Sequence, residues 1–156
     1  MEKILIGKYV KTHGIKGEIR IKSNINYKEK VFKIGNTLII DNQEFIINTY
    51  RVHQEYDMIT FKGINNINDI ISLKGSLVYI NKDLINLDKD EYLDTDLINL
   101  DVYMESNLVG KVKDIRYITK DKKLLTVNSS LVPFELIKKI DLKNKKIIIE
   151  EVSGLL

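Results

Sequence analysis

The sequence predicts a mainly β protein built from two small β-barrels, with one short helix in the first. Short segments rich in β-branched residues alternate with turn signals along both halves of the chain. Only one segment, in the first half, has the three- and four-residue apolar spacing of a helix. The length of 156 residues fits two units of about 70–80 residues each.

In the first half, strands are expected at residues 3–11, 16–22, 37–40, 43–52, 57–62 and 76–80. The first two flank His13-Gly14-Ile15-Lys16-Gly17, whose glycines permit the positive φ angles of a tight connection. Asp41-Asn42 is typical of a hairpin turn, because both residues tolerate left-handed conformations. Residues 64–74 predict the short helix, with Asn65 or Asn66 as N-cap and Gly75 beyond its end.

Residues 81–91 are acidic and poor in β-branched residues, which indicates a connector between domains at residues 1–80 and 92–156. In the second domain, strands are expected at residues 100–104, 108–118, 123–127, 131–134 and 145–152. Val112 and Ile115 are three residues apart, which breaks the alternation of a strand and predicts a β-bulge. Pro133, the only proline, is expected to end a strand.

The composition argues against most kinds of enzyme and cofactor site. The chain has no cysteine and two histidines, which removes disulfides, thiolate nucleophiles and zinc-thiolate or iron–sulfur sites. Neither histidine belongs to a recognisable nucleophile motif. We therefore expect a protein that is not an enzyme and holds no metal or cofactor. With no membrane-length apolar run and no signal-peptide core, we expect a cytoplasmic protein without a membrane partner.

The charge is unevenly distributed, and this suggests where RNA would bind. Residues 1–33 hold nine basic and three acidic side chains, and residues 106–146 hold eleven and four. Lys11, His13, Lys16 and Arg20 place basic groups around the glycine-containing turn, where they are candidates for contact with RNA phosphates. The alternative is an ordinary solvated, lysine-rich surface.

The stretch between the basic regions is acidic, with two basic and eight acidic side chains in residues 81–105. Asp94, Asp96 and Glu105 fit positions 1, 3 and 12 of a calcium loop, but Asn99 stands where the loop needs glycine. A solvated connector is therefore favoured over a metal site, and contact with a basic protein is a third possibility. Tyr92-Leu93 either anchors such a contact or packs against its own barrel.

The ordered set of motifs resembles the ribosome maturation factor RimM family over nearly the whole chain. The resemblance rests on motifs in both halves, namely the run from Ile6 to Arg20, Arg51-Val52-His53, the region from Phe61 to Gly75, Asp90-Glu91-Tyr92, Asp96-Leu97-Ile98, the run from Leu108 to Val112, Leu131-Val132-Pro133-Phe134 and Gly154-Leu155-Leu156. It implies a barrel like those of translation factors followed by a PRC-barrel.

The resemblance also implies a non-catalytic factor that assists 16S rRNA maturation and assembly of the head of the 30S subunit. Its partners would be precursor 30S particles or 16S rRNA and a ribosomal protein of the head, the nineteenth of the small-subunit series. Asp90, Glu91, Tyr92 and Leu93 would contact that protein. The family commonly has proline where this chain has Thr12, and a second tyrosine where it has Leu93, which keeps apolar area without the ring and hydroxyl.

Two other interpretations remain open at the level of sequence. A metal-dependent rRNA-processing enzyme would use the acidic cluster, although a two-metal site usually draws carboxylates from more than one segment. A generic RNA-binding module would need no ribosomal protein. We expect the protein to be a monomer.

Overall fold

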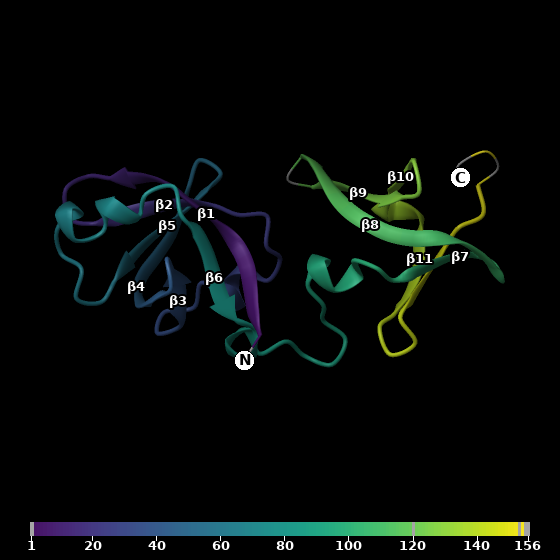
Figure 1. Ribbon diagram of the computed structural model, residues 1–156, viewed down its shortest axis with the longest axis horizontal. Helices are drawn as coiled ribbons and strands as arrows, with labels where there is room; N and C mark the ends of the chain where they lie inside the picture. The colour runs from purple at the N-terminus through teal and green to yellow at the C-terminus, as the bar shows by residue number, and fades with distance from the viewer. Residues whose placement is uncertain (1, 120, 153, 155–156) are drawn as a thin grey trace. The chain divides into compact units, whose positions relative to one another are not determined.

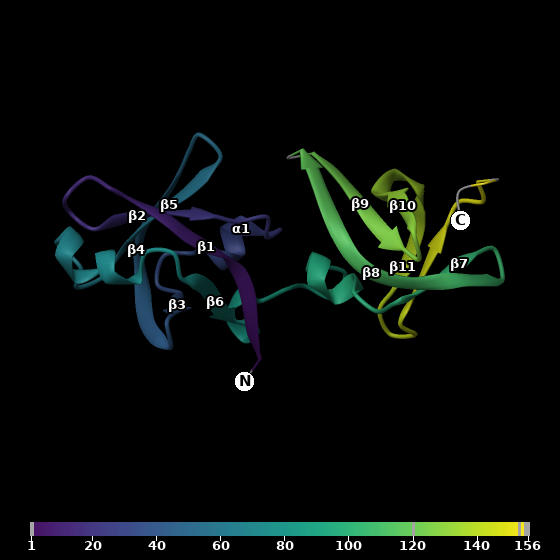
Figure 2. The same ribbon diagram turned by 45° about the horizontal axis from the view of Figure 1, so that its top comes forward.

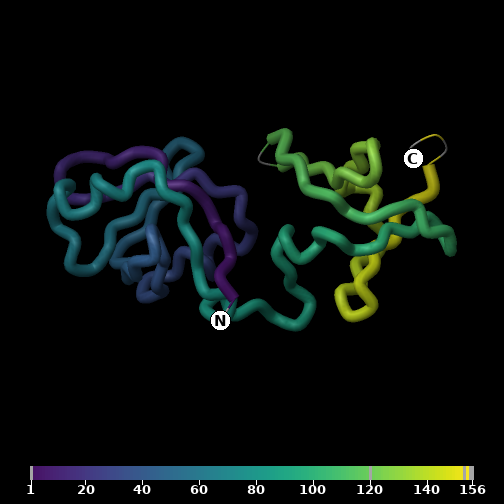
Figure 3. Tube along the Cα trace, viewed as in Figure 1, coloured from purple at the N-terminus to yellow at the C-terminus, as the bar shows by residue number. Residues whose placement is uncertain are grey.

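The computed structural model describes residues 2–119, 121–152 and 154, and the chain divides into two compact units, residues 1–91 and 92–156 (Figure 1). The chain passes from the first unit to the second at Glu91–Tyr92, as the tube in Figure 3 allows the reader to follow. Both units are built mainly from strands, which confirms the predicted fold class. Every strand expected from the sequence is present, with its ends moved by at most a few residues.

The first unit is a closed barrel with the strand order β1-β2-β5-β4-β3-β6. Its strands, all paired antiparallel, are β1 (Lys3–His13), β2 (Glu18–Lys22), β3 (Thr37–Ile40), β4 (Gln43–His53), β5 (Tyr56–Phe61) and β6 (Leu77–Asn81). Asp41 and Asn42 have φ angles of 51° and 59°, which confirms the predicted hairpin turn between β3 and β4.

Strand β1 closes the barrel because it bends to pair with both β2 and β6. Its register shifts between Leu5 and Gly7 on the β6 side and between Tyr9 and Lys11 on the β2 side. A Cβ atom at Gly7 would lie 2.5 Å from the backbone oxygen of Lys22. Glycine at this bend therefore allows the two backbones to approach.

The predicted helix at residues 64–74 is replaced by two 3-10 turns, η1 (Ile67–Asp69) and η2 (Ile71–Leu73). Asn66 caps the first turn by accepting a hydrogen bond from the backbone N–H of Asn68. It is one of the two residues predicted as the N-cap. β-Branched and asparagine residues have low helix propensity, so the segment buries Ile70 and Leu73 without forming a continuous α-helix.

The short α-helix of the first unit lies elsewhere, at α1 (Lys28–Val31), and was not predicted. Four residues are too few to show a helical period. A further 3-10 turn, η3 (Lys82–Ile85), follows β6 and buries Ile85. Residues 81–91, which were expected to form an acidic connector, instead begin with the end of β6 and with η3 and belong to the first unit.

The second unit has a six-stranded sheet with the order β10-β9-β8-β7-β12-β11. Its strands are β7 (Asp101–Met104), β8 (Asn107–Thr119), β9 (Lys122–Val127), β10 (Ser130–Pro133), β11 (Ile137–Asp141) and β12 (Lys146–Ile149), with 3-10 turns η4 (Asp94–Leu97) and η5 (Phe134–Leu136). β12 and β7 are parallel and the other neighbours antiparallel.

The predicted bulge is confirmed as a register shift between Val112 and Asp114 in β8. Strand β11 was missed, because its own register shift between Ile137 and Lys139 hides the alternation of apolar and polar residues. The core of this unit is formed by aliphatic side chains that are at most 6% exposed, namely Leu97, Leu100, Val102, Val112, Leu125, Val127, Val132, Ile147 and Ile149.

Candidate functional site

Three basic side chains and one methionine lie in a row across four neighbouring strands on the outer face of the first barrel. Lys11 of β1 lies opposite Arg20 of β2, and both Arg20 and Arg51 of β4 lie opposite Met58 of β5. Residues directly opposite each other on paired strands point to the same side of the sheet. Strands β1, β2, β5 and β4 follow one another in this order around the barrel (Figure 2).

Met58 shares this outer side but is fully buried. Its neighbours in register are the two arginines, whose long apolar stems are suited to cover a thioether. Arg51 is exposed and Arg20 is partly buried. We call Lys11, His13, Arg20, Arg51 and His53 the basic face.

Within the basic face, Arg20 contacts His13 directly. An Nη2–H group of Arg20 donates to Nδ1 of His13 at 3.1 Å. A guanidinium only donates, so Nδ1 of His13 is the acceptor and carries no proton in this arrangement. The Arg20 Cζ atom also lies 5.6 Å from the centre of the Tyr56 ring.

The second histidine joins the same cluster from another hairpin, since the ring centres of His13 and His53 are 6.1 Å apart. His53 ends β4 and lies opposite Tyr56. The sequence analysis did not place His53, Arg51 or Tyr56 at this site, because only the pairing of β2 with β5 brings the two hairpins together.

Glu18 supplies negative charge within the cluster. Its carboxylate accepts two hydrogen bonds from Arg51, from Nη2 at 2.7 Å and from Nε at 3.1 Å. These hydrogen bonds hold the pKa of Glu18 below its ordinary value, assisted by the charge of Arg51 and weakly by the two histidines, and opposed by partial burial.

The two predicted lysines are exposed, Lys11 in the row and Lys16 in the hairpin loop. Within the described parts of the chain, neither forms a salt bridge. The loop depends on glycine: at Gly17, with φ of 95°, a Cβ atom would lie 3.0 Å from the Ile64 side chain. The structure therefore brings His13 and Arg20 into contact, with Lys11 beside them and Lys16 in the adjoining loop.

The predicted protein-binding residues have different environments. Asp90 is exposed, and Tyr92 is partly exposed while packing against the core of the second unit. Leu93 is fully buried, so its side chain lies in the interior and not on the surface where a contact residue was expected. Apolar side chains are driven into the interior wherever the fold permits it.

Glu91 is already paired within the first unit. Lys30 of α1 forms an ion pair with Glu91 and a longer one, 3.4 Å between Nζ and Oδ2, with Asp88. The hydrogen bond from Lys30 is the main cause that lowers the pKa of Glu91, and a bond from the backbone N–H of Asp88 adds to it. This ion pair fixes the end of the acidic segment to α1.

Asp94 is buried, in contrast to the solvated connector expected there. Both carboxylate oxygens lie 3.0 Å from Nζ of Lys123, and Oδ2 also accepts from the Tyr117 hydroxyl at 2.9 Å. Asp96 accepts a hydrogen bond from the backbone N–H of Leu93 at 2.9 Å. These contacts use the carboxylates that a calcium loop would need. Among the residues that the structure describes, no group of three or more His, Asp or Glu side chains is arranged to hold a metal ion.

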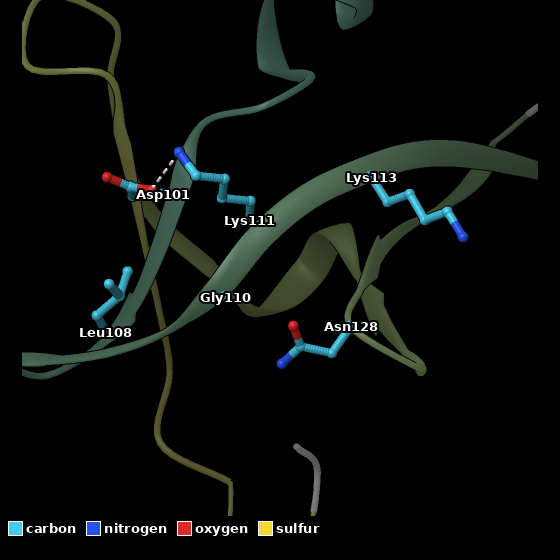
Figure 4. A pocket seen from close by; sticks show the side chains of 6 residues that line it. All are labelled: Asp101, Leu108, Gly110, Lys111, Lys113 and Asn128. Carbon is cyan, nitrogen blue, oxygen red and sulfur yellow. Dashed lines mark ion pairs between the residues drawn. The ribbon is translucent and has the colours of Figure 1, made fainter.

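A shallow hollow lies on the second unit beside β8 (Figure 4). Its lining consists of Asp101, Leu108, Gly110, Lys111, Lys113 and Asn128. Nζ of Lys111 is 3.0 Å from Oδ1 of Asp101, so one of its two lysines is neutralised.

None of the described helices has the length and apolarity needed to cross a membrane.

Two family models together match most of the chain. The RimM N-terminal domain matches residues 4–85 and the PRC-barrel domain matches residues 89–156. Curated relatives named ribosome maturation factor RimM, from Staphylococcus aureus strains bovine RF122 / ET3-1 and JH9, are 37% identical over 99% of this chain and 99% of their own length.

Two solved structures show a weaker likeness. A protein of Pseudomonas aeruginosa, described as a 16S ribosomal RNA processing protein RimM, matches with a TM-score of 0.48 at 19% identity, over 97% of this chain and 99% of its own. The N-terminal domain of RimM from Thermus thermophilus matches with a TM-score of 0.44 at 18% identity, over 52% of this chain and 91% of its own. On the family models and the curated relatives, the chain belongs to the RimM family, with a RimM N-terminal domain followed by a PRC-barrel domain.

Proposed function

We propose that this protein is a ribosome maturation factor that acts by binding and not by catalysis. Its curated relatives carry that name over the whole chain length. The basic row of Lys11, Arg20 and Arg51 across the first barrel is the observation that carries the proposal. A surface of this kind suits the phosphate backbone of rRNA, because cations contribute affinity without requiring a particular base sequence.

The proposed protein partner is the ribosomal protein of the small-subunit head that the resemblance implies, the nineteenth of its series. Asp90 and Tyr92 provide an exposed carboxylate and a partly exposed ring close together in the chain. Acidic groups speed the capture of a basic protein, and a tyrosine ring lengthens the life of the complex. Leu93 and Glu91 support this segment from within, through burial and through the ion pair with Lys30.

The factor would hold protein and 16S rRNA near their final geometry while the 30S head assembles, acting as a monomer in the cytoplasm. Bringing two partners into one complex reduces the entropic cost of docking them. No covalent step is needed, and the factor leaves when native contacts replace its own.

Binding of the purified full-length chain to 16S rRNA and to the head protein tests the proposal. The variant pair Lys11→Gln/Arg20→Gln should weaken RNA binding more than Lys33→Gln/Lys74→Gln, which removes the same charge from exposed positions outside the row. Tyr92→Ala should weaken binding to the head protein, whereas Tyr103→Ala, a partly buried tyrosine of the same unit, should not.

The competing interpretations predict different results. Binding to 16S rRNA with no affinity for the head protein would indicate a generic RNA-binding module. Magnesium-dependent cleavage of precursor rRNA that is lost in Asp94→Asn/Asp96→Asn would indicate an rRNA-processing enzyme. Equal RNA affinity of the two charge-matched pairs would remove the basic face from the proposal.

A further inference from the structure

Both histidines of the chain lie in the basic face, although they come from different hairpins. His13 ends β1 and His53 ends β4, and their ring centres are 6.1 Å apart. The whole sequence contains no other histidine. Side chains that gain or lose a proton near neutral pH are thus concentrated at the surface proposed to meet RNA.

Because Arg20 and His13 share a hydrogen bond, the protonation of His13 decides whether Arg20 can donate to another acceptor. While Nδ1 of His13 accepts from Arg20, that N–H of Arg20 is occupied. When Nδ1 takes up a proton it becomes a donor, and Arg20 loses its acceptor. Protonation of His13 therefore makes two N–H groups available to an anion, the new one on Nδ1 of His13 and the released one on Arg20.

Arg20 also has an unused donor in the described structure, because its buried Nε atom has no hydrogen-bond partner. Buried donors are normally paired, so an orphan of this kind indicates that a partner is missing. An acceptor with several oxygens, such as phosphate, could satisfy the guanidinium once it turns away from His13.

Several charged groups surround the two rings. The cations are Lys11 on β1, Arg20 on β2 and Arg51 on β4, and Glu18 on β2 faces them. Tyr56 on β5 contributes its ring, and Lys16 and Glu55 lie exposed in the adjoining turns. Since Glu18 is already held by Arg51, its carboxylate is not free to balance two further positive charges.

We propose that His13, Arg20 and His53 form a binding site for a phosphate group of RNA, and that the site takes up a proton as the phosphate binds. The proton comes from solvent and adds to Nδ1 of His13, and the released guanidinium of Arg20 turns to the phosphate oxygens. His53, whose ring centre is 6.1 Å from that of His13, supports the same group. The inference rests on the proposed RNA contact of the basic face and adds to it the chemical group bound and its link to pH.

The test is the affinity of the full-length chain for 16S rRNA at pH 6.0 and at pH 7.5, at one ionic strength. Uptake of one proton changes the binding constant by at most about tenfold per pH unit, so we expect binding about three- to tenfold tighter at pH 6.0. Phosphodiester groups do not titrate in this range, and the histidine-free variant described below shows how much of the difference comes from the two histidines.

The variant His13→Asn separates the proton from the hydrogen bond. The asparagine carbonyl can accept from Arg20 at the position of Nδ1, but it cannot take up a proton. We expect His13→Asn to bind 16S rRNA more weakly than the unmodified chain and to lose most of the gain between pH 7.5 and pH 6.0. The double variant His13→Asn/His53→Gln contains no histidine and should bind equally at both pH values.

The outcomes distinguish this inference from the proposed function. Binding that does not change with pH, or a gain that persists in the histidine-free variant, would overturn the phosphate–proton site and leave the RNA contact standing. Failure to bind 16S rRNA at either pH would overturn both. Circular dichroism of each variant shows whether it is folded, and an equal spectrum assigns the loss to the site.

Discussion

Asp94 and Lys123 form a salt bridge across the second unit, with both carboxylate oxygens 3.0 Å from Nζ. Asp94 is 4% exposed, and the Lys123 ammonium also lies 4.6 Å from the centre of the Phe134 ring. The pair joins the start of the unit, just after Tyr92, to the β8–β9 hairpin. The segment proposed to contact a ribosomal protein is therefore anchored from within.

Asp94→Asn is expected to lower the free energy of unfolding by about 1–3 kcal/mol, because it leaves the Lys123 ammonium without its carboxylate. Asp114→Asn is the control, since this aspartate is exposed on β8, and it should cost about 0.5 kcal/mol or less. Urea unfolding followed by circular dichroism measures both. Equal effects would mean that the buried pair contributes no more than a surface charge.

In the first unit, the fully buried carboxylate of Asp57 is likewise paired with a lysine and a tyrosine hydroxyl. It accepts a hydrogen bond from the Tyr50 hydroxyl at 2.6 Å and one from Lys28 of α1 at 2.8 Å. Asp57→Asn should cost about 2–4 kcal/mol and Tyr50→Phe about 1 kcal/mol, since the phenyl ring keeps its stacking on Phe32. If chemical denaturation ranks the two variants in the reverse order, Asp57 is not the centre of this network.

The ion pair between Glu18 and Arg51 gives a pH-dependent prediction. Because the pKa of Glu18 is lowered in the folded chain, its contribution is present above the ordinary glutamate value of 4.5 and is lost as the pH falls through the lowered value. The difference in stability between the unmodified chain and Glu18→Gln should therefore be largest near pH 7 and shrink below pH 4.5. Urea midpoints between pH 3 and pH 7 measure this difference in stability. A difference that stays the same at every pH would contradict a stabilising ion pair between Glu18 and Arg51.

Gly7→Ala should destabilise the first barrel by about 1–3 kcal/mol, because the new Cβ atom would meet the backbone of Lys22, which cannot move aside. Gly75→Ala is a useful comparison. The φ of 93° at this position is strained for alanine, but nothing lies within 4 Å of the added atom. We therefore expect the free energy of unfolding to fall by about 1 kcal/mol. Thermal unfolding of both variants decides whether steric contact outweighs backbone strain.

The basic face predicts the salt dependence of RNA binding. Each lost phosphate contact should reduce the slope of log affinity against log salt by about 0.7–0.9. Lys11→Gln/Arg20→Gln should thus flatten the slope by about one to two units, whereas Lys33→Gln/Lys74→Gln should leave it nearly unchanged. Titrations at several salt concentrations test this, and parallel lines for the two pairs would exclude contact through the row.

The sequence by itself determined the strands, the Asp41-Asn42 turn and the bulge after Val112, because these follow from local alternation and from the conformations that single residues tolerate. It also brought His13 and Arg20 into one candidate site, since a short hairpin keeps them close. It failed where the signal was weak or disguised, as in α1 with four residues and in β11 with its register shift.

Only the tertiary structure decided which distant residues meet. The pairing of β2 with β5 adds Arg51, His53 and Tyr56 to the basic face, and no local pattern records a register between two hairpins. Burial was likewise decided by the fold, which places Leu93 inside and pairs Asp94 with Lys123, whereas the sequence showed only an acidic stretch. Whether a charge or an apolar side chain faces solvent depends on what packs against it, and those neighbours come from remote parts of the chain.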